Sequence, residues 1–184
     1  MSALPFAALV VIGAGWGATQ PLAKLAVSDG YKPLGILVWQ TALIGLTLGT
    51  VTVLRGRRLP FDAGALRVYA IIAAIGSVLP GMASYSAAVH LPSGVLSILL
   101  SSIPMLAFPI ALVLGIERFR ARRLFGLSLG LAGVLMLILP ETGLPRDVAP
   151  FWVGVALVSS CLYAMEGNYV ARWGLRGMDP LQVL

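Results

Sequence analysis

The sequence predicts an all-α membrane protein, folded as a bundle of transmembrane helices. Hydrophobic residues make up 59% of the 184 residues, charged residues make up 11%, and the mean hydropathy is +0.95. A water-soluble domain of this size cannot bury so much apolar surface, so lipid is expected to surround it. The apolar residues also fall into six long stretches, and a helix needs about 20 such residues to cross a bilayer.

Short polar breaks separate the expected membrane spans. The first apolar stretch continues to Val27, which is too long for the core of a signal peptide, so it is expected to be a retained span. The connections are short, so neighbouring helices should be antiparallel. A seventh helix should begin near Pro180. The six expected spans are residues 5–27, 34–54, 66–89, 92–114, 123–140 and 150–171.

Basic residues predict the orientation of the chain. The loops after the second, fourth and sixth spans, with their flanks, hold ten arginines, whereas the alternate loops hold Lys32 and Arg146. Positively charged loops stay in the cytoplasm, so the N-terminus and these three loops should be cytoplasmic in the inner membrane. This placement accounts for the net charge of +6 without nucleic acid as a partner. The ten are Arg55, Arg57, Arg58, Arg67, Arg118, Arg120, Arg122, Arg123, Arg172 and Arg176.

A weak internal repeat appears when the chain is shifted by 147 residues. The first span then overlays the sixth, Gly30 meets Gly177, and Pro33 meets Pro180. Five expected spans lie within one period. Because five is odd, the second copy must enter the membrane from the opposite side.

Such an inverted-topology repeat is typical of secondary transporters, whose binding site lies between the repeats near the membrane midplane. We therefore expect two domains. Residues 1–145 would form a first five-helix repeat, and residues 146–184 would form the start of a second, inverted and incomplete repeat.

Several short motifs occur in a recurring order along these spans. They are Trp16-Gly17 followed by Lys24, Pro33 at the start of the second span, Tyr85 in the third, Pro104 and then Gly115-Ile116-Glu117 in and after the fourth, and Gly126 and Gly133 in the fifth. In this order the chain resembles the EamA family of the drug/metabolite transporter superfamily. The resemblance covers about residues 1–140 and the first helix and a half of the second repeat.

The resemblance implies ten spans in two five-helix repeats, so this chain is expected to correspond to half to two-thirds of a longer transporter. One position departs from the family pattern. The family often has an arginine in the second span where Trp39-Gln40-Thr41 stands here. No role that depends on that charge is expected in this chain.

Four residues inside the expected spans are predicted to bind substrate, because polar groups are costly in a membrane. Trp16 and Tyr163 are equivalent in the repeat and lie mid-span, where an aromatic pair could enclose a solute. Helix packing is the alternative. Gln20 lies one turn from Trp16 and can donate and accept hydrogen bonds, either to a solute or to another helix. Glu166 is the only acidic residue inside an expected span and could carry a proton or bind an amine, unless it extends to the cytoplasmic interface.

Other polar residues have simpler readings. Lys24 lies near the outer end of its span and either extends to the interface or binds an anion. Glu117 is expected to form an interfacial ion pair with Arg118, Arg120 or Arg122. His90 should be a turn residue.

Four prolines are expected to interrupt their helices: Pro21, Pro80, Pro104 and Pro109.

The sequence argues against an enzyme. The four aspartates lie in loops and the single histidine lies at a turn, which does not suit an intramembrane protease. There is no phosphate-binding loop and no metal-ligand spacing, and Cys161 is the only cysteine. No cofactor is expected beyond a coupled proton.

The expected function is secondary transport of small organic solutes, such as metabolites, amino acids or drugs, by alternating access. The expected partners are the solute and the lipid bilayer, and a homodimer is compatible with the packing glycines. A non-transporting membrane scaffold or assembly subunit is the alternative. The substrate, the direction of transport and the coupling ion stay open at this point.

Overall fold

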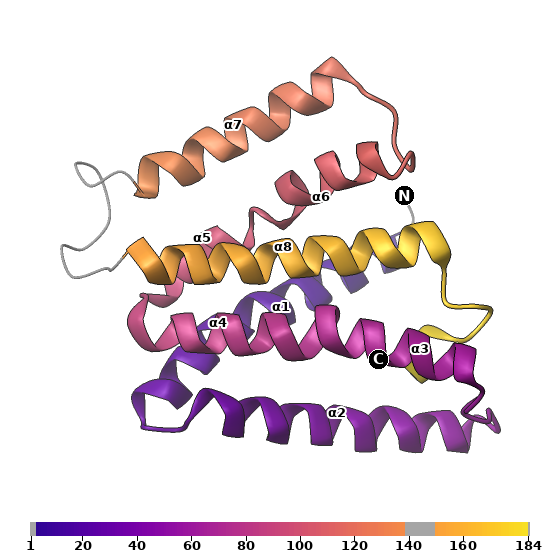
Figure 1. Ribbon diagram of the computed structural model, residues 1–184. Coiled ribbons are helices and arrows are strands. Elements are labelled where there is room, and N and C mark those ends of the chain that lie inside the picture. Colours follow the sequence, from indigo (N-terminus) through magenta and orange to yellow (C-terminus); the bar gives the residue numbers. More distant parts are fainter. Residues whose placement is uncertain (1–2, 139–149, 184) are drawn as a thin grey trace.

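The computed structural model describes residues 3–138 and 150–183, and within these ranges the chain forms helices joined by short loops (Figure 1). The described residues contain no strand, which confirms the all-α fold class. The elements are α1 (Ala3–Ser28), α2 (Pro33–Leu54), α3 (Ala63–Ile72), the π-helical segment η1 (Ala73–Val78), α4 (Leu79–His90), α5 (Ser93–Leu100), α6 (Ile103–Val113), α7 (Ala121–Ile138), α8 (Pro150–Trp173) and α9 (Pro180–Val183).

Four helical stretches of the described chain are long and apolar enough to cross a membrane: Pro5–Ser28, Pro33–Leu54, Ala63–His90 and Ser93–Val113. They match the first four predicted spans to within a few residues. The helices α7 and α8 form where the fifth and sixth spans were predicted, but they are not among these four. Their crossing of the membrane therefore stays a prediction.

The helix α8 occupies the centre of the bundle and contacts α4, α5, α6 and η1 (Figure 1). A helix screened from lipid by its neighbours can carry polar residues that a lipid-facing helix cannot. The face of α8 that packs inward consists of small side chains, which let the neighbouring backbones approach closely. Its buried residues are Val153, Ala156, Ser159, Ser160, Ala164 and Asn168.

Three side chains of α8 donate hydrogen bonds to backbone carbonyls of its neighbours. Ser159 Oγ donates to the carbonyl of Pro80 in α4 over 2.8 Å. Ser160 Oγ donates to the carbonyl of Leu99 in α5 over 3.0 Å. Asn168 Nδ2 donates to a carbonyl of α6 over 3.0 Å. These bonds fix both the depth and the rotation of α8 within the bundle.

The third span changes its helical winding at its middle. Within η1 the hydrogen bonds widen, and the N–H of Leu79 donates to the carbonyl of Ala74, five residues earlier. Pro80 follows directly and supplies no N–H, so the regular bonding pattern cannot continue through this point. Short π-helical segments of this kind often occur at functional sites. The helical stretch Ala63–His90 continues through Pro80, so the predicted interruption takes the form of a change in winding and not of a break.

The other three prolines divide into two cases. Pro104 lies at the start of α6, just after the break between α5 and α6, as predicted. The helix α1 continues through Pro21, and α6 continues through Pro109, so the predicted interruptions at these two residues are wrong. A chain in lipid keeps its remaining backbone hydrogen bonds because no water replaces them, and this favours a continuous helix around a single missing bond.

The start of the proposed second repeat has the same local structure as the start of the first. The helix α2 begins at Pro33 and α9 begins at Pro180, 147 residues later. The glycines before α2 and α9, Gly30 and Gly177, have φ angles of +93° and +79°. Glycine takes up such left-handed conformations without steric cost. In Figure 1, α1 and α8 run in opposite directions.

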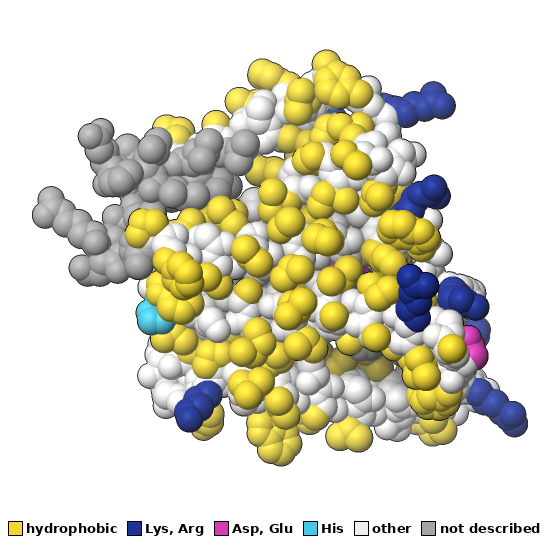
Figure 2. Space-filling model, in the orientation of Figure 1, with side chains coloured by type: hydrophobic (Ala, Val, Ile, Leu, Met, Phe, Trp, Pro, Cys, Tyr) yellow, Lys and Arg dark blue, Asp and Glu magenta, His cyan; other side chains and the backbone are white. Residues whose placement is uncertain are grey.

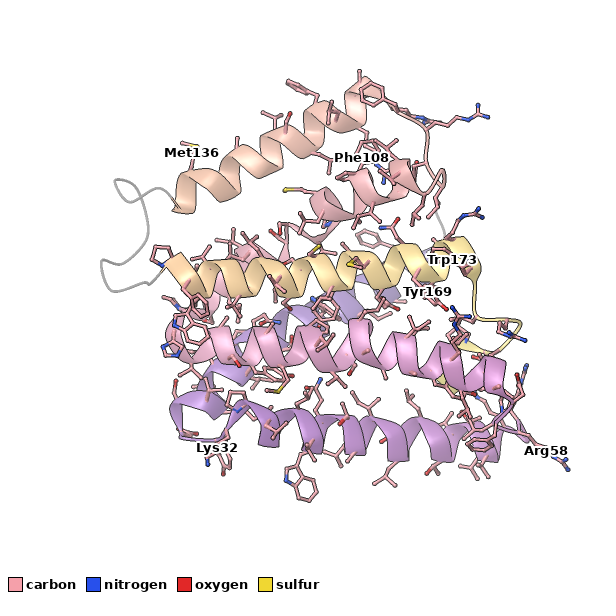
Figure 3. The ribbon with its side chains drawn as sticks, viewed as in Figure 1. Lys32, Arg58, Phe108, Met136, Tyr169 and Trp173 are labelled. Carbon is pink, nitrogen blue, oxygen red and sulfur yellow. The ribbon has the colours of Figure 1, made fainter. Side chains whose placement is uncertain are left out.

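Lysine and arginine side chains gather mainly at one end of the bundle (Figure 2). Lys32 and Arg58 mark the two ends of α2, and Arg58 lies at the arginine-rich end (Figure 3). Tyr169 and Trp173 lie near this end of α8, with ring centroids 5.2 Å apart. Aromatic side chains at the end of a helix suit the boundary between lipid and water.

Candidate functional site

Trp16 and Tyr163, the two aromatic residues predicted to face one another, are in contact. Their ring centroids lie 6.0 Å apart and the ring planes are inclined at 71°, an edge-to-face arrangement. Trp16 comes from α1 and Tyr163 from α8, so the contact joins the two positions that the proposed repeat aligns. The Trp16 side chain remains more than half exposed and Tyr163 is partly buried. The contact is therefore present, and a role in substrate binding stays a prediction.

A hydrogen bond joins two further polar residues of the expected spans, and one of them, Tyr85, lies near Tyr163. Tyr163 is within electrostatic range of Tyr85 in α4 and of Glu166 in α8. The Tyr85 hydroxyl donates a hydrogen bond to Gln40 Oε1 in α2. Sequence analysis did not assign Tyr85 or Gln40 to the site. The available signals were that both are polar residues within expected spans and that Tyr85 belongs to the family motifs.

Gln20 lies one turn along α1 from Trp16, as predicted. Its Nε2 donates to Thr19 Oγ1 in the same helix over 3.2 Å. Its Oε1 is buried and has no hydrogen-bond partner among the described residues. A buried acceptor without a donor costs about 1–3 kcal/mol. Gln20 therefore has an acceptor without a donor, and its amide forms no hydrogen bond to another helix among the described residues.

Glu166 packs against the π-helical segment of the third span. A Cβ atom placed on Gly76 of η1 would lie 2.7 Å from Glu166 Cγ, so the absence of a side chain at Gly76 makes room for the glutamate. Glu166 is partly buried and forms no ion pair within the described ranges. An unpaired carboxyl group inside a helical bundle is a candidate for proton or cation binding.

The ammonium group of Lys24 binds the C-terminal end of a neighbouring helix, α4. Its Nζ donates to the carbonyl of Ala88 over 2.8 Å and to the carbonyl of Val89 over 3.1 Å. These are carbonyls of the last turn of α4, which have no helical N–H partner and attract positive charge. Lys24 thus caps α4 and ties α1 to it, a role that sequence analysis missed because the two residues are more than 60 positions apart.

His90 also lies at this end of the bundle, and its role goes beyond a simple turn residue. Its imidazole stacks on the Trp152 indole, with centroids 4.0 Å apart and planes 12° apart. The stack joins the end of α4 to the beginning of α8. Together with the Lys24 cap, it holds α1, α4 and α8 together at the end of the bundle away from most arginines.

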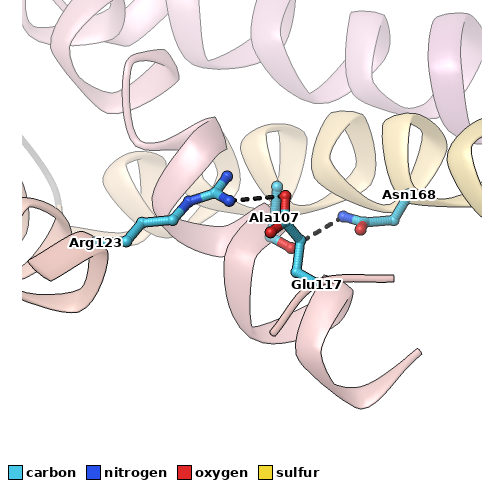
Figure 4. Close-up of polar contacts among 4 residues, drawn as sticks. All are labelled: Ala107, Glu117, Arg123 and Asn168. Atoms are coloured by element: carbon cyan, nitrogen blue, oxygen red, sulfur yellow. Dashed lines mark hydrogen bonds and ion pairs between the residues drawn. The ribbon is translucent and has the colours of Figure 1, made fainter. Parts of the chain in front are cut away.

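Glu117 forms the interfacial ion pair predicted for it, but its partner is Arg123. The Arg123 Nη1 and Glu117 Oε1 atoms are 2.7 Å apart (Figure 4). Asn168 lies nearby and donates to the Ala107 carbonyl. The nearer arginines in the sequence do not form this pair. The described residues contain no group of three or more histidine, cysteine, aspartate or glutamate residues placed to hold a metal ion.

The comparison with protein families agrees with this arrangement of apolar helices. The model of the EamA-like transporter family matches residues 3–139. The chain belongs to the EamA-like transporter family. The match spans α1 to α7, so the family pattern covers Trp16, Gln20, Tyr85 and Gln40, whereas Tyr163 and Glu166 lie beyond it.

Curated relatives carry the similarity further along the chain. The "Uncharacterized inner membrane transporter YedA" of Escherichia coli K12 is 26% identical over 167 residues, which cover 91% of this chain and 53% of that protein. Proteins of the same name from strains O6:H1 and O157:H7 match equally. The chain thus spans about half the length of these EamA relatives. No solved structure gives a significant match. Family and apolar helices together identify an integral membrane protein.

Proposed function

We propose that this protein is a secondary transporter that moves a small organic solute across the inner membrane. The observation that carries the proposal is the Trp16–Tyr163 contact, which joins two equivalent positions of the internal repeat. Transporters of inverted-repeat architecture bind their substrates where the two repeats meet, near the membrane midplane. The opposite directions of α1 and α8 support this arrangement (Figure 1). The family of the chain and its inner membrane relatives support transport as the function.

The residues around this contact suit a solute that carries a positive charge and an apolar portion. Trp16 and Tyr163 offer aromatic surfaces, which attract both apolar groups and cations. Gln20 offers an acceptor that has no partner in the described part of the chain. Glu166 offers a carboxyl group without a partner among the described residues. Amines, amino acids and lipophilic cations have the complementary groups, so they are the proposed substrate class.

Glu166 is the proposed coupling group. A carboxyl group that binds a proton in one state and a cationic solute in the other allows the two to exchange across the membrane. In this scheme Trp16 and Tyr163 separate when the repeats move, and the solute enters between them. The arginine-rich end of the bundle supports a cytoplasmic placement of that end and of the N-terminus.

The test is solute flux in proteoliposomes made with the complete gene product, using a panel of amines, amino acids and lipophilic cations. An imposed pH gradient should drive accumulation of at least one panel member. Glu166→Gln should abolish this accumulation, while the exposed loop variant Asp29→Asn should retain it. A panel without any flux, or equal accumulation by Glu166→Gln, would refute the proposal and favour a scaffold.

A further inference from the structure

A second polar site lies at the arginine-rich end of the bundle, between α6 and α7. An open pocket of about 460 Å³ is lined by Glu117, Arg120, Arg122 and Arg123, and these four residues define the arginine pocket. Three guanidinium groups face one carboxylate in this pocket. The lining therefore favours an anion. The site lies outside the Trp16–Tyr163 region and is not used by the proposed transport mechanism.

The single carboxylate of the arginine pocket is already neutralised. Glu117 pairs with Arg123 over 2.7 Å (Figure 4). The Arg123 guanidinium also lies 4.9 Å from the ring centroid of Phe108, which is a buried residue of α6. The ion pair and the ring contact hold Arg123 in place. Arg120 and Arg122 have no ion pair within the described ranges, so their positive charges remain available to a ligand.

The arginine pocket opens where apolar helices end. The candidate membrane span Ser93–Val113 stops just before it, and Val113 is 87% exposed. Phe119 and Phe125, which flank the arginines, are 64% and 66% exposed. Large apolar side chains with this exposure are expected to face lipid tails or the lipid–water boundary. A ligand here thus meets guanidinium groups on one side and apolar surface on the other.

We propose that the arginine pocket binds the headgroup of an anionic phospholipid. A phosphodiester oxygen pair matches the two parallel N–H groups of a guanidinium, which makes arginine suited to phosphate recognition. The acyl chains would lie along the exposed apolar side chains of α6 and α7. A soluble phosphate would use the guanidinium groups but not the apolar rim, so the rim favours a lipid. Basic pockets at membrane boundaries recognise anionic headgroups in this way.

The proposal is tested by lipid binding to the protein purified in detergent, measured by native mass spectrometry. The probes are phosphatidylglycerol and, as the neutral counterpart, phosphatidylcholine. The double variant Arg120→Gln/Arg122→Gln removes two exposed charges and leaves the Glu117–Arg123 pair intact. Its affinity for phosphatidylglycerol should fall by on the order of tenfold. The matched control is Arg57→Gln/Arg58→Gln, two exposed arginines in another basic loop, which should bind as the unchanged protein does.

The melting temperature is a second measurement, which distinguishes a loss of lipid binding from misfolding. Phosphatidylglycerol should raise the melting temperature of the unchanged protein and of the control, but not that of the double variant, whose melting temperature without lipid should be unaltered. Equal binding of phosphatidylcholine, equal losses in both double variants, or no loss in either would overturn the proposal. Displacement of phosphatidylglycerol by millimolar inorganic phosphate would assign the pocket to a soluble anion instead and would also overturn it.

Discussion

Trp16 and Tyr163 meet edge to face, with 6.0 Å between their ring centroids, although 147 residues separate them in the chain. The contact brings together the first helix of the first repeat and the first helix of the proposed second repeat. Around it lie the unpaired acceptor of Gln20 and the carboxyl group of Glu166.

Trp16→Ala should weaken transport without unfolding the protein. In the proposed scheme the solute enters between the two rings, and an aromatic contact contributes about 0.5–1.5 kcal/mol, so loss of the Trp16 ring should raise the solute concentration at half-maximal flux roughly two- to tenfold. Trp16→Phe should keep most of the contact. Trp39→Ala is the matched control, because Trp39 is also exposed on a membrane helix, α2, and makes no ring contact with Tyr163 among the described residues. Flux measured in proteoliposomes for all three variants checks this, and an equal effect of Trp39→Ala would contradict it.

Gly76→Ala should displace the side chain of Glu166. The new Cβ would lie 2.7 Å from Glu166 Cγ, closer than such atoms approach, and the flexible glutamate can move away. We expect a folded protein in which proton-driven uptake is reduced. Gly45→Ala is the control, since a Cβ there has no neighbour within 4 Å. Uptake under a pH gradient, measured with the melting temperature, distinguishes displacement of Glu166 from unfolding. Unchanged uptake in Gly76→Ala would show that the position of Glu166 is not critical.

Lys24→Met should destabilise the protein because it removes both hydrogen bonds to the last turn of α4. The expected loss is on the order of 2 kcal/mol of unfolding free energy. Lys32→Met, at an exposed position on the loop before α2, should have little effect. Thermal unfolding in detergent provides the measurement. If Lys24→Met lost solute binding at unchanged stability, Lys24 would belong to the binding site rather than to the helix cap.

Ser159→Ala should loosen the packing of α8 against α4. It removes the bond to the Pro80 carbonyl, and hydrogen bonds between membrane helices contribute about 0.6–2 kcal/mol. Ser128→Ala is a matched control because Ser128 Oγ bonds only within its own helix, to the Phe125 carbonyl. The difference in unfolding free energy between the two variants isolates the interhelical bond. Equal values would mean that this bond does not stabilise the bundle.

Much of the fold could be predicted because its signals are local. The lengths of the apolar runs located the four stretches from Pro5 to Val113 that are able to cross a membrane. A helix was predicted to begin near Pro180, and α9 begins there; Gly30 and Gly177, which the repeat offset aligns, both adopt a left-handed conformation. The interruptions predicted at Pro21 and Pro109 were wrong because each proline removes a single backbone hydrogen bond, and the surrounding helix continues in lipid.

The candidate site could be predicted in part. The repeat alone suggested that Trp16 and Tyr163 belong together, because equivalent positions of two repeats lie near their interface. The polar residues Tyr85 and Gln40 were visible in the sequence, but their bond to one another was not. The same holds for Gly76 and Glu166, which meet only because the π-helical segment of the third span packs against α8.

Composition and motif order predict a helical, apolar chain and its family, because neither depends on contacts between helices. The partners of the polar side chains follow only from the packed bundle: Arg123 for Glu117, the end of α4 for Lys24, and the Pro80 carbonyl for Ser159. The physical reason is that a membrane helix forms from its own backbone hydrogen bonds. Its side-chain contacts depend on the depth and rotation at which separate helices pack together.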